Sequence, residues 1–317
     1  MSEKIDRKLK AALDETRLLI LGVQILLGFE FQSVFQDGFD GLDPASKHIS
    51  LASLGLIVLA IALLISPSMQ HRIVEAGEST PRLIATTNLL ACLALLPLTI
   101  GLAASAYVVT QRTFGLAWGA AIASFLGCAA AFCWFGLEFI IGRHRETEKM
   151  PTSPTPLKIK IEQLLTEARL IIPGGQALFG FQFLAMLTTG FDRLPDAAKI
   201  VHATALCLVG LNVIMMMTPA ALHRLSFGGE DSPRFLRLGS AFVIAGPAFL
   251  AAGIAGEVYV VFLKALSSPA VAVTASIAAL LVLGGFWYVW PLTLRQIKQG
   301  PELHAGLLQQ DDGGKNC

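Results

Sequence analysis

The side chains that could do chemistry lie in a stretch that the chain contains twice, at residues 15–42 and 167–194, where half of the aligned positions are identical. Glu30 stands about seven residues from the outer end of an apolar segment, roughly 10 Å deep in a bilayer at 1.5 Å per residue. An acid at that depth is a candidate for handling protons or cations, unless it makes a buried hydrogen bond or reaches the interface. Its counterpart Gln182 keeps the polarity without the charge.

Two glutamines, Gln24 and Gln176, occupy the same place in both copies, near the middle of the apolar segment. Lipid offers an amide no hydrogen-bond partner, so each side chain needs one inside the protein. One interpretation is that the two amides line a polar path on either side of an axis that relates the copies. The other is that each ties its own bundle together by a hydrogen bond of about 0.6–2 kcal/mol.

Glu15 and Arg17, with their counterparts Glu167 and Arg169, fall in the first turn of each apolar segment. They are candidates for an ion pair at a gate or an interface. The alternative is that the arginines extend to lipid phosphates and the glutamates lie favourably at a helix N-terminus.

A basic pair also recurs, as His71-Arg72 and His223-Arg224, each shortly after a proline that is predicted to end an apolar segment. We expect these pairs to contact anionic lipid headgroups. A pH-sensing role for the two histidines is the alternative.

Helical periodicity places two recurrent stripes on opposite sides of the helix predicted in each copy. Stripe A consists of Arg17, Gln24, Gly28 and Phe31 in the first copy and Arg169, Gln176, Gly180 and Phe183 in the second. Stripe B consists of Glu15, Gly22, Leu26 and Phe29, and of Glu167, Gly174, Leu178 and Phe181. Because both sides recur, this helix is predicted to be the central one of its bundle, with glycines that let a neighbour approach closely.

The composition indicates a multi-pass membrane protein. Of 317 residues, 54% are hydrophobic and 15% charged, whereas a soluble domain carries about 25% charged residues. Eight spans are predicted, at about 13–35, 49–65, 83–109, 116–141, 168–189, 197–217, 238–263 and 271–291. The predicted fold is all-α, with eight transmembrane helices in two parallel-oriented four-helix repeats packed about a pseudo-twofold axis.

The predicted domains are a first repeat (1–145), a Pro/Ser linker (146–158), a second repeat (159–295) and a polar tail (296–317) ordered only at its start. Four spans per repeat is an even number, so both repeats insert in the same orientation. Basic residues gather on the side of the termini and the linker, which the positive-inside rule places in the cytoplasm of a bacterial inner-membrane protein.

Other functional classes are not indicated. A net charge of +1 gives no sign of nucleic-acid binding, and P-loop, GxGxxG, HExxH, GxSxG and CxxCH patterns are absent from the sequence, so neither an enzyme nor a cofactor is expected. The five cysteines lack metal-ligand spacing. Glu257 is interpreted as an interfacial acid, and Asn212 and His202 as polar residues that hold helices together.

The motifs together resemble a family of small bacterial four-helix integral membrane proteins of unknown function. They are Glu15-x-Arg17, Gly22 to Leu26 (GVQIL), Phe39, Ser66-Pro67 and His71-Arg72, with matching residues in the second half. Members are commonly single four-helix units, so this chain resembles two fused copies. Some members carry an automatic sodium:proton antiporter label, but the mid-membrane aspartate usual in antiporters is absent from the predicted spans.

The sequence therefore favours a small transporter or channel for H⁺ or a monovalent cation, with Glu30, Gln24, Gln176 and Gln182 as candidates for the ion path. The alternative is a non-transporting scaffold or stress-related membrane protein. The expected partners are the lipid bilayer and the ion, and assembly into a homo-oligomer is left open.

Overall fold

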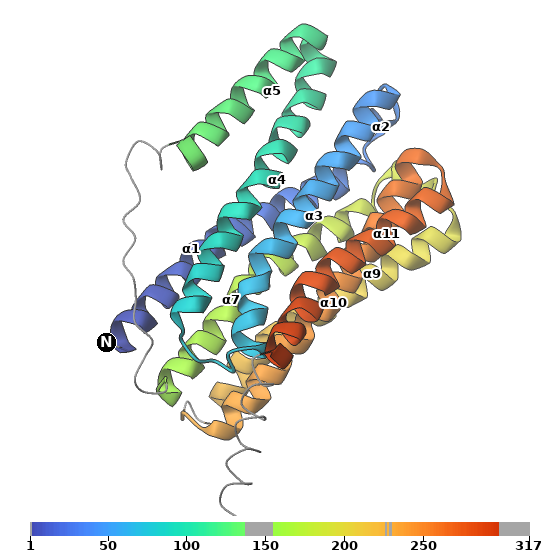
Figure 1. The fold of residues 1–317 in the computed structure, drawn as a ribbon. Helices are drawn as coiled ribbons and strands as arrows, with labels where there is room; N and C mark the ends of the chain where they lie inside the picture. The colour runs from blue at the N-terminus through green and yellow to red at the C-terminus, as the bar shows by residue number, and fades with distance from the viewer. Residues whose placement is uncertain (1, 137–154, 226, 228–229, 298–317) are drawn as a thin grey trace, which may run out of the picture.

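The computed structural model describes residues 2–136, 155–225, 227 and 230–297, and every regular element among them is helical. The first repeat contains α1 (Ser2–Ser33), α2 (Asp37–Asp40), α3 (Pro44–Ile73), α4 (Pro81–Phe114), α5 (Leu116–Ala131) and the π-helix η1 (Phe132–Gly136) (Figure 1). The second contains α7 (Leu157–Ala185), α8 (Thr189–Asp192), α9 (Asp196–Leu225), α10 (Pro233–Leu266), α11 (Pro269–Gly284) and the π-helix η2 (Gly285–Val289). The prediction of an all-α fold is confirmed for this part of the chain.

The repeats correspond element by element, but the offset between them changes at their fourth helices. The starts of α3 and α9, and those of α4 and α10, lie 152 residues apart, whereas those of α5 and α11 lie 153 apart. One residue, Gly115, joins α4 to α5, while Ser267 and Ser268 join α10 to α11. With the corrected offset, Trp134 in η1 is the counterpart of Trp287 in η2. The repeat therefore extends through the fourth helices, where a constant offset loses it.

The long helices begin at capping sequences that both repeats share. Thr80 and Ser232 accept hydrogen bonds from the backbone N–H groups of Leu83 and Phe235, at 3.2 and 3.1 Å. A proline follows each cap at the start of the helix, where its missing N–H costs nothing. The third helix of each repeat thus starts at the same place for the same local reason.

Prolines do not end the helices where the sequence predicts an end. α3 continues through Pro67 to Ile73, and α9 continues through Pro219 to Leu225. A proline removes one backbone hydrogen bond, but neighbouring helices in a membrane bundle compensate for it. The ends predicted at residues 65 and 217 are therefore wrong, and the His71-Arg72 pair belongs to the last turn of α3.

α3 is enclosed by both repeats. Of its most apolar window 72% is buried, against 50% for α10 and 28% for α4. It packs against α1 and α4 of its own repeat and against α10, α11 and η2 of the second (Figure 1). Across this contact the Trp287 indole N–H donates to the Ala62 carbonyl (3.0 Å), and Ser66 donates to the Phe286 carbonyl (3.1 Å). α3, and not the first helix of a repeat, therefore occupies the centre.

α1 and α7 form the seam between the repeats. The Gln24 side chain lies where a Cβ on Gly174 would be, and the Phe181 ring lies where a Cβ on Gly28 would be. The Phe29 and Phe181 rings pack with their centroids 4.6 Å apart. The seam thus joins stripe A of α1, with Phe29 of stripe B at its edge, to stripe B of α7, and its close approach depends on two glycines.

This seam does not have the predicted pseudo-twofold symmetry. A twofold axis that brings Gln24 against Gly174 would also bring Gln176 against Gly22. Instead Gln176 is exposed, and the position of a Cβ on Gly22 is open to at least 4 Å among the described residues. The two repeats contact each other through different faces.

Five helices in the described part are long and apolar enough to cross a bilayer, namely α3, α4, α9, α10 and α11 with its continuation to Ile297. The segment Leu19–Ser33 of α1 and the helix α5 are apolar but shorter. The helices therefore indicate a multi-pass membrane protein, with five candidate spans in place of the eight predicted. Residues 137–141 of the fourth predicted span, 146–154 of the linker and 298–317 of the tail lie outside the described residues.

Replacing Gly174 by alanine should destabilise the protein, because the added methyl group overlaps the Gln24 side chain at the seam. Overpacking of this kind costs about 1–3 kcal/mol. A thermal unfolding series in detergent measures the loss. Gly55→Ala in α3 is the control, since that Cβ position is open; equal stability of the two variants would contradict the tight seam.

Candidate functional site

One side of α7 meets polar residues at three levels. Glu167, the pair Gly174-Gly175 and Gln182 follow one another at spacings of seven or eight residues, which is about two helical turns. At 1.5 Å per residue, the rise along the helix from Glu167 to Gln182 is about 22 Å. Neighbouring helices add polar side chains at each level, which we name the inner, middle and outer levels.

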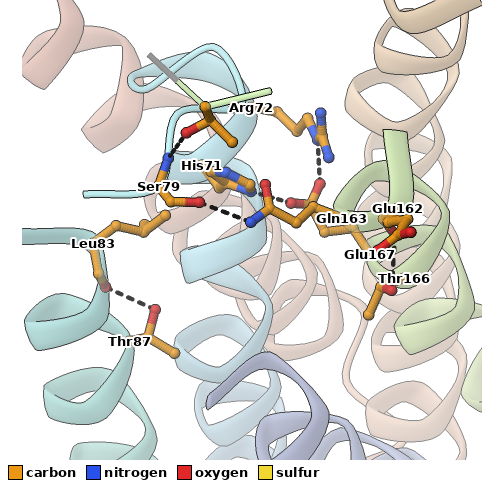
Figure 2. Close-up of polar contacts among 10 residues, drawn as sticks. His71, Arg72, Ser79, Leu83, Thr87, Glu162, Gln163, Thr166 and Glu167 are labelled. Atoms are coloured by element: carbon orange, nitrogen blue, oxygen red, sulfur yellow. Dashed lines mark hydrogen bonds and ion pairs between the residues drawn. The ribbon is translucent and has the colours of Figure 1, made fainter. Parts of the chain in front are cut away.

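At the inner level, the Glu167 carboxylate is buried between His71 and Arg72 (Figure 2). One carboxylate oxygen bonds His71 Nδ1, and the other accepts a hydrogen bond from Arg72 Nε. An ionised carboxylate only accepts hydrogen bonds, so beside Arg72 the His71 ring carries its proton on Nδ1. Charges from α3 and α7 thereby compensate each other between the repeats.

A set of hydrogen bonds surrounds this ion cluster and holds the loop after α3 to the start of α7 (Figure 2). Gln163 donates to the Ser79 hydroxyl at 2.8 Å, and the Ser79 N–H donates to the Thr155 hydroxyl at 3.0 Å. Lys160 pairs with Glu78. Burial opposes the ionisation of Glu78, but Lys160 and the hydrogen bonds of Thr155 together outweigh it and hold the pKa of this carboxyl below its usual value.

The first basic pair does not lie where lipid contact would require. His71 and Arg72 are 0% and 6% exposed, which corrects their lipid-contact interpretation: the buried Glu167 carboxylate draws them into the protein. In the second repeat, His223 is half-buried with Nε2 3.8 Å from an Asp231 oxygen. The Arg224 side chain lies outside the described part.

The four residues predicted for a gate or an interface fare differently. Glu167 lies at an interface between the repeats. Arg17 is half-buried, Arg169 is exposed, and the Glu15 side chain lies outside the described part. In the second copy, Glu167 therefore pairs with two residues of α3 and not with Arg169 of its own motif.

At the middle level, Gln24 and Asn212 approach α7 at Gly174 and Gly175. Both amides are buried, and neither the nitrogen nor the oxygen of either side chain has a hydrogen-bond partner among the described residues. An unpaired buried polar group costs about 1–3 kcal/mol. Gln176 is exposed on the outer side of α7, which corrects the prediction that both recurrent glutamines line one path.

At the outer level, α7, α9 and α10 meet in a buried cluster of Gln182, His202 and Glu257. His202 Nδ1 lies 3.0 Å from a Glu257 oxygen, and Gln182 donates its side-chain N–H to the same carboxyl at 3.2 Å. His202 Nε2 faces the Gln182 backbone carbonyl at 3.0 Å and so carries a hydrogen. A second proton can then sit either on Nδ1 or on the Glu257 carboxyl, and the other hydrogen bonds of the cluster stay the same in both cases.

The first repeat has its own buried acid at this depth. Glu30 on α1 is 7% exposed and accepts hydrogen bonds from the hydroxyls of Ser53 (3.1 Å) and Ser105. The prediction placed an acid deep in the bundle, and the structure surrounds it with hydroxyl groups of α3 and α4. Three helices again supply the cluster.

Comparison with known proteins matches residues 1–138 and, separately, residues 155–291 to a family of unknown function, DUF6328. The chain belongs to this family. Two tandem copies make up the chain, which confirms the resemblance inferred from the motifs and the duplication. No curated protein and no solved structure matches the chain.

The two DUF6328 copies hold their outer acid on different helices. Glu30 of α1 corresponds to Gln182, whereas Glu257 of α10 corresponds to Ser105. Each three-helix junction therefore has one carboxylate, although the two carboxylates are not sequence counterparts. Position by position the acids look unrelated, which is why the sequence did not indicate Glu257; comparing the pairs Glu30–Ser105 and Gln182–Glu257 would have shown the exchange.

At the opposite end of the bundle from the inner level, Asp40 of the first DUF6328 copy meets the second. Lys264 and Arg193 bond its carboxylate oxygens at 2.7 and 3.3 Å. The Lys264 hydrogen bond is the main reason that the pKa of Asp40 lies below its usual value. In the described part of the chain, no group of three or more His, Cys, Asp or Glu side chains is placed to hold a metal ion.

Glu167→Gln should destabilise the protein strongly, because it leaves the Arg72 guanidinium buried without its counter-charge. Breaking a buried pair from one side costs about 3–5 kcal/mol. Thermal unfolding in detergent would show the loss, with Arg169→Gln on the exposed side of the same helix as the control. A Glu167→Gln protein as stable as the control would refute the inner level as the link between the repeats.

Asp40→Asn should lower stability near neutral pH only slightly, by at most about 1 kcal/mol, because the site is exposed. A carboxyl whose pKa is lowered in the folded state stabilises the fold at pH values above its unfolded-state pKa of about 3.9. This contribution disappears as the pH falls through the lower folded-state pKa. Unfolding midpoints of variant and wild type should therefore differ at pH 6 and converge below pH 4. Asp196→Asn, with a side chain 97% exposed, is the comparison; a gap that persists in acid would contradict the pairing.

Proposed function

We propose that this DUF6328 chain is an eight-span protein of the bacterial inner membrane that moves protons, or a monovalent cation, along the side of α7 as a small transporter or channel. The observation that carries the proposal is the outer cluster. His202 Nδ1 lies 3.0 Å from a Glu257 oxygen inside an apolar bundle, and the remaining hydrogen bonds suit a proton on either of these two atoms. Ionisable residues inside membrane segments generally mark ion or proton pathways.

The order of the polar levels supports movement across the membrane. From Glu257 and His202, the next polar groups along α7 are the unpartnered amides of Gln24 and Asn212, and then the Glu167 cluster. Retaining two amides without partners costs stability, and polar atoms that are free to bind a passing ion or water would explain that cost. Glu30 provides a second buried acid at the depth of Gln182, in the first repeat.

The proposed topology, with four spans in each repeat, rests on the lengths and directions of the helices. Five helices are long and apolar enough to cross, and the shorter apolar segments of α1 and α5 would complete four spans in the first repeat. The span that the sequence predicts at residues 168–189, within α7, would complete four in the second. With four spans each, α1 and α7 enter from the same side, and their parallel course in Figure 1 agrees with this. The basic residues near Glu167 then face the cytoplasm with both termini.

The alternative is a scaffold that transports nothing. The inner level favours it, because His71 and Arg72 bind the Glu167 carboxylate and hold the repeats together. In a scaffold, the outer cluster would be helix glue of the same kind. The two readings differ in whether proton flux exists and depends on Glu257.

Purified protein in liposomes with an internal pH-sensitive dye should show flux under an imposed proton, Na⁺ or K⁺ gradient. Glu257→Gln should lower this flux at least about tenfold, which corresponds to about 1.4 kcal/mol of barrier, because the amide cannot release a proton to His202. Glu30→Gln tests the first repeat in the same assay. Silence of the wild type under all three gradients would end the transport proposal.

The matched control is Glu162→Gln, which makes the same chemical change on the exposed side of α7. Folded yield and the unfolding midpoint are measured for each variant alongside flux. A scaffold predicts that Glu257→Gln lowers yield while neither it nor the wild type conducts.

A further inference from the structure

The duplication gives α1 and α7 two recurrent stripes each, and the seam between the repeats is built mainly from one stripe of each helix. Stripe A of α1 and stripe B of α7 meet, through the contacts of Gln24 with Gly174 and of Gly28 with Phe181. Contact between unlike faces is a heterologous interface, and such an interface always leaves one face of each kind unused. Here the unused faces are stripe A of α7 and stripe B of α1, except that Phe29 of stripe B packs on Phe181 at the edge of the seam.

The unused stripes carry the same residue types as the stripes in contact, yet most of their described residues are exposed. On α1, the Cβ position of Gly22 is open, Leu26 is half-buried, and Phe29 remains 56% exposed although its ring also packs on Phe181. On α7, Gln176 and Gly180 are exposed, and the Cβ position of Gly180 is open. Gln176 therefore presents an amide on an apolar helix surface, where lipid offers no hydrogen-bond partner. Packing against a glycine, as Gln24 does, would take this amide out of lipid.

A second contact has the same pattern. Trp287 of η2 is fully buried, and its indole N–H bonds the Ala62 carbonyl on α3 of the first repeat. The counterpart of Trp287 is Trp134 in η1, which is only half-buried, and the counterpart of Ala62 is Ile214 on α9, which is 62% exposed. In Figure 1, α5 lies beside α4 at the edge of the molecule, away from the second repeat. The counterparts of the donor and of the acceptor are therefore both present in the chain, but they do not contact each other.

We propose that a second copy of this chain binds head to tail across these faces. Stripe B of α1 in one copy packs on stripe A of α7 in the other, with Gly22 against Gln176 and Phe29 against Gly180. The η1 end of the first repeat covers α9 of the partner, as η2 covers α3 within the chain. The interface between two copies would thus repeat the geometry of the seam within one copy. The proposal is independent of transport.

Disulfide trapping in membranes tests the contact directly. In a background with the five native cysteines changed to alanine, Gly22→Cys with Gln176→Cys should give covalent dimers or larger species on mild oxidation. Gln24→Cys with Gly174→Cys should close within one chain and remain monomeric. Gly22→Cys with Leu281→Cys, which pairs two exposed positions on different surfaces, measures random collisions. Cross-linking of the first pair no greater than that of the collision control overturns the proposal.

A bulky residue on the unused stripe gives a second test that does not depend on cysteines. Gly22→Trp should leave the fold of one chain intact, because its Cβ position is open, and should shift the wild-type assembly to monomers in native mass spectrometry from mild detergent. Gly55→Trp, at another open position outside both stripes, should leave the assembly unchanged. A wild type that is monomeric in both detergent and membranes would sink the inference. Proton flux that persists or fails in these variants bears on the transport proposal alone.

Discussion

The carboxylate of Glu167 constrains the whole arrangement, because a fully buried charge must have its counter-charges in the protein. His71 and Arg72 provide them from the end of α3, which can happen only if α3 runs past its proline into the interior between the repeats. Once that contact is made, the position of α7 along α3 is set. The levels further along α7 follow at fixed rises, so the placement of Gln182 opposite its partners depends on a contact about 22 Å away.

Local chemistry in the sequence predicts much of this fold. The duplication, the all-α character and the starts of the helices at capped prolines are visible in residue order, because each depends on neighbours along the chain. The proline ends at Pro67 and Pro219 were mispredicted, since neighbouring helices and not the proline decide whether a helix continues in a membrane bundle. The position of α3 at the centre is likewise a property of packing between repeats.

The candidate site was harder to predict for a related reason. Two copies with the same stripes give no indication of which stripe faces the other copy. Gln24 and Gln176 therefore look equivalent in sequence, although Gln24 is buried in the protein and Gln176 is exposed on its surface. The exchange between Glu30 and Glu257 is invisible at single positions, because each acid faces a neutral counterpart. Only the three-helix junction, which combines residues far apart in the chain, shows that each repeat places one buried carboxylate at this level.

Fusion of the two copies explains why the junctions could diverge. When separate units are identical, every unit carries the same residues on its contact faces. A substitution that suits one unit in a heterologous contact is therefore present in its neighbour as well. In the fused chain, α7 packs inside the seam with its stripe B while α1 uses its stripe A, and the two outer clusters have different surroundings. The second repeat could then place a histidine beside its acid, whereas the first kept serine hydroxyls around Glu30. Hydroxyl groups hold a carboxyl in place, whereas a ring nitrogen can also take up its proton, so the two junctions differ in the proton chemistry available to them.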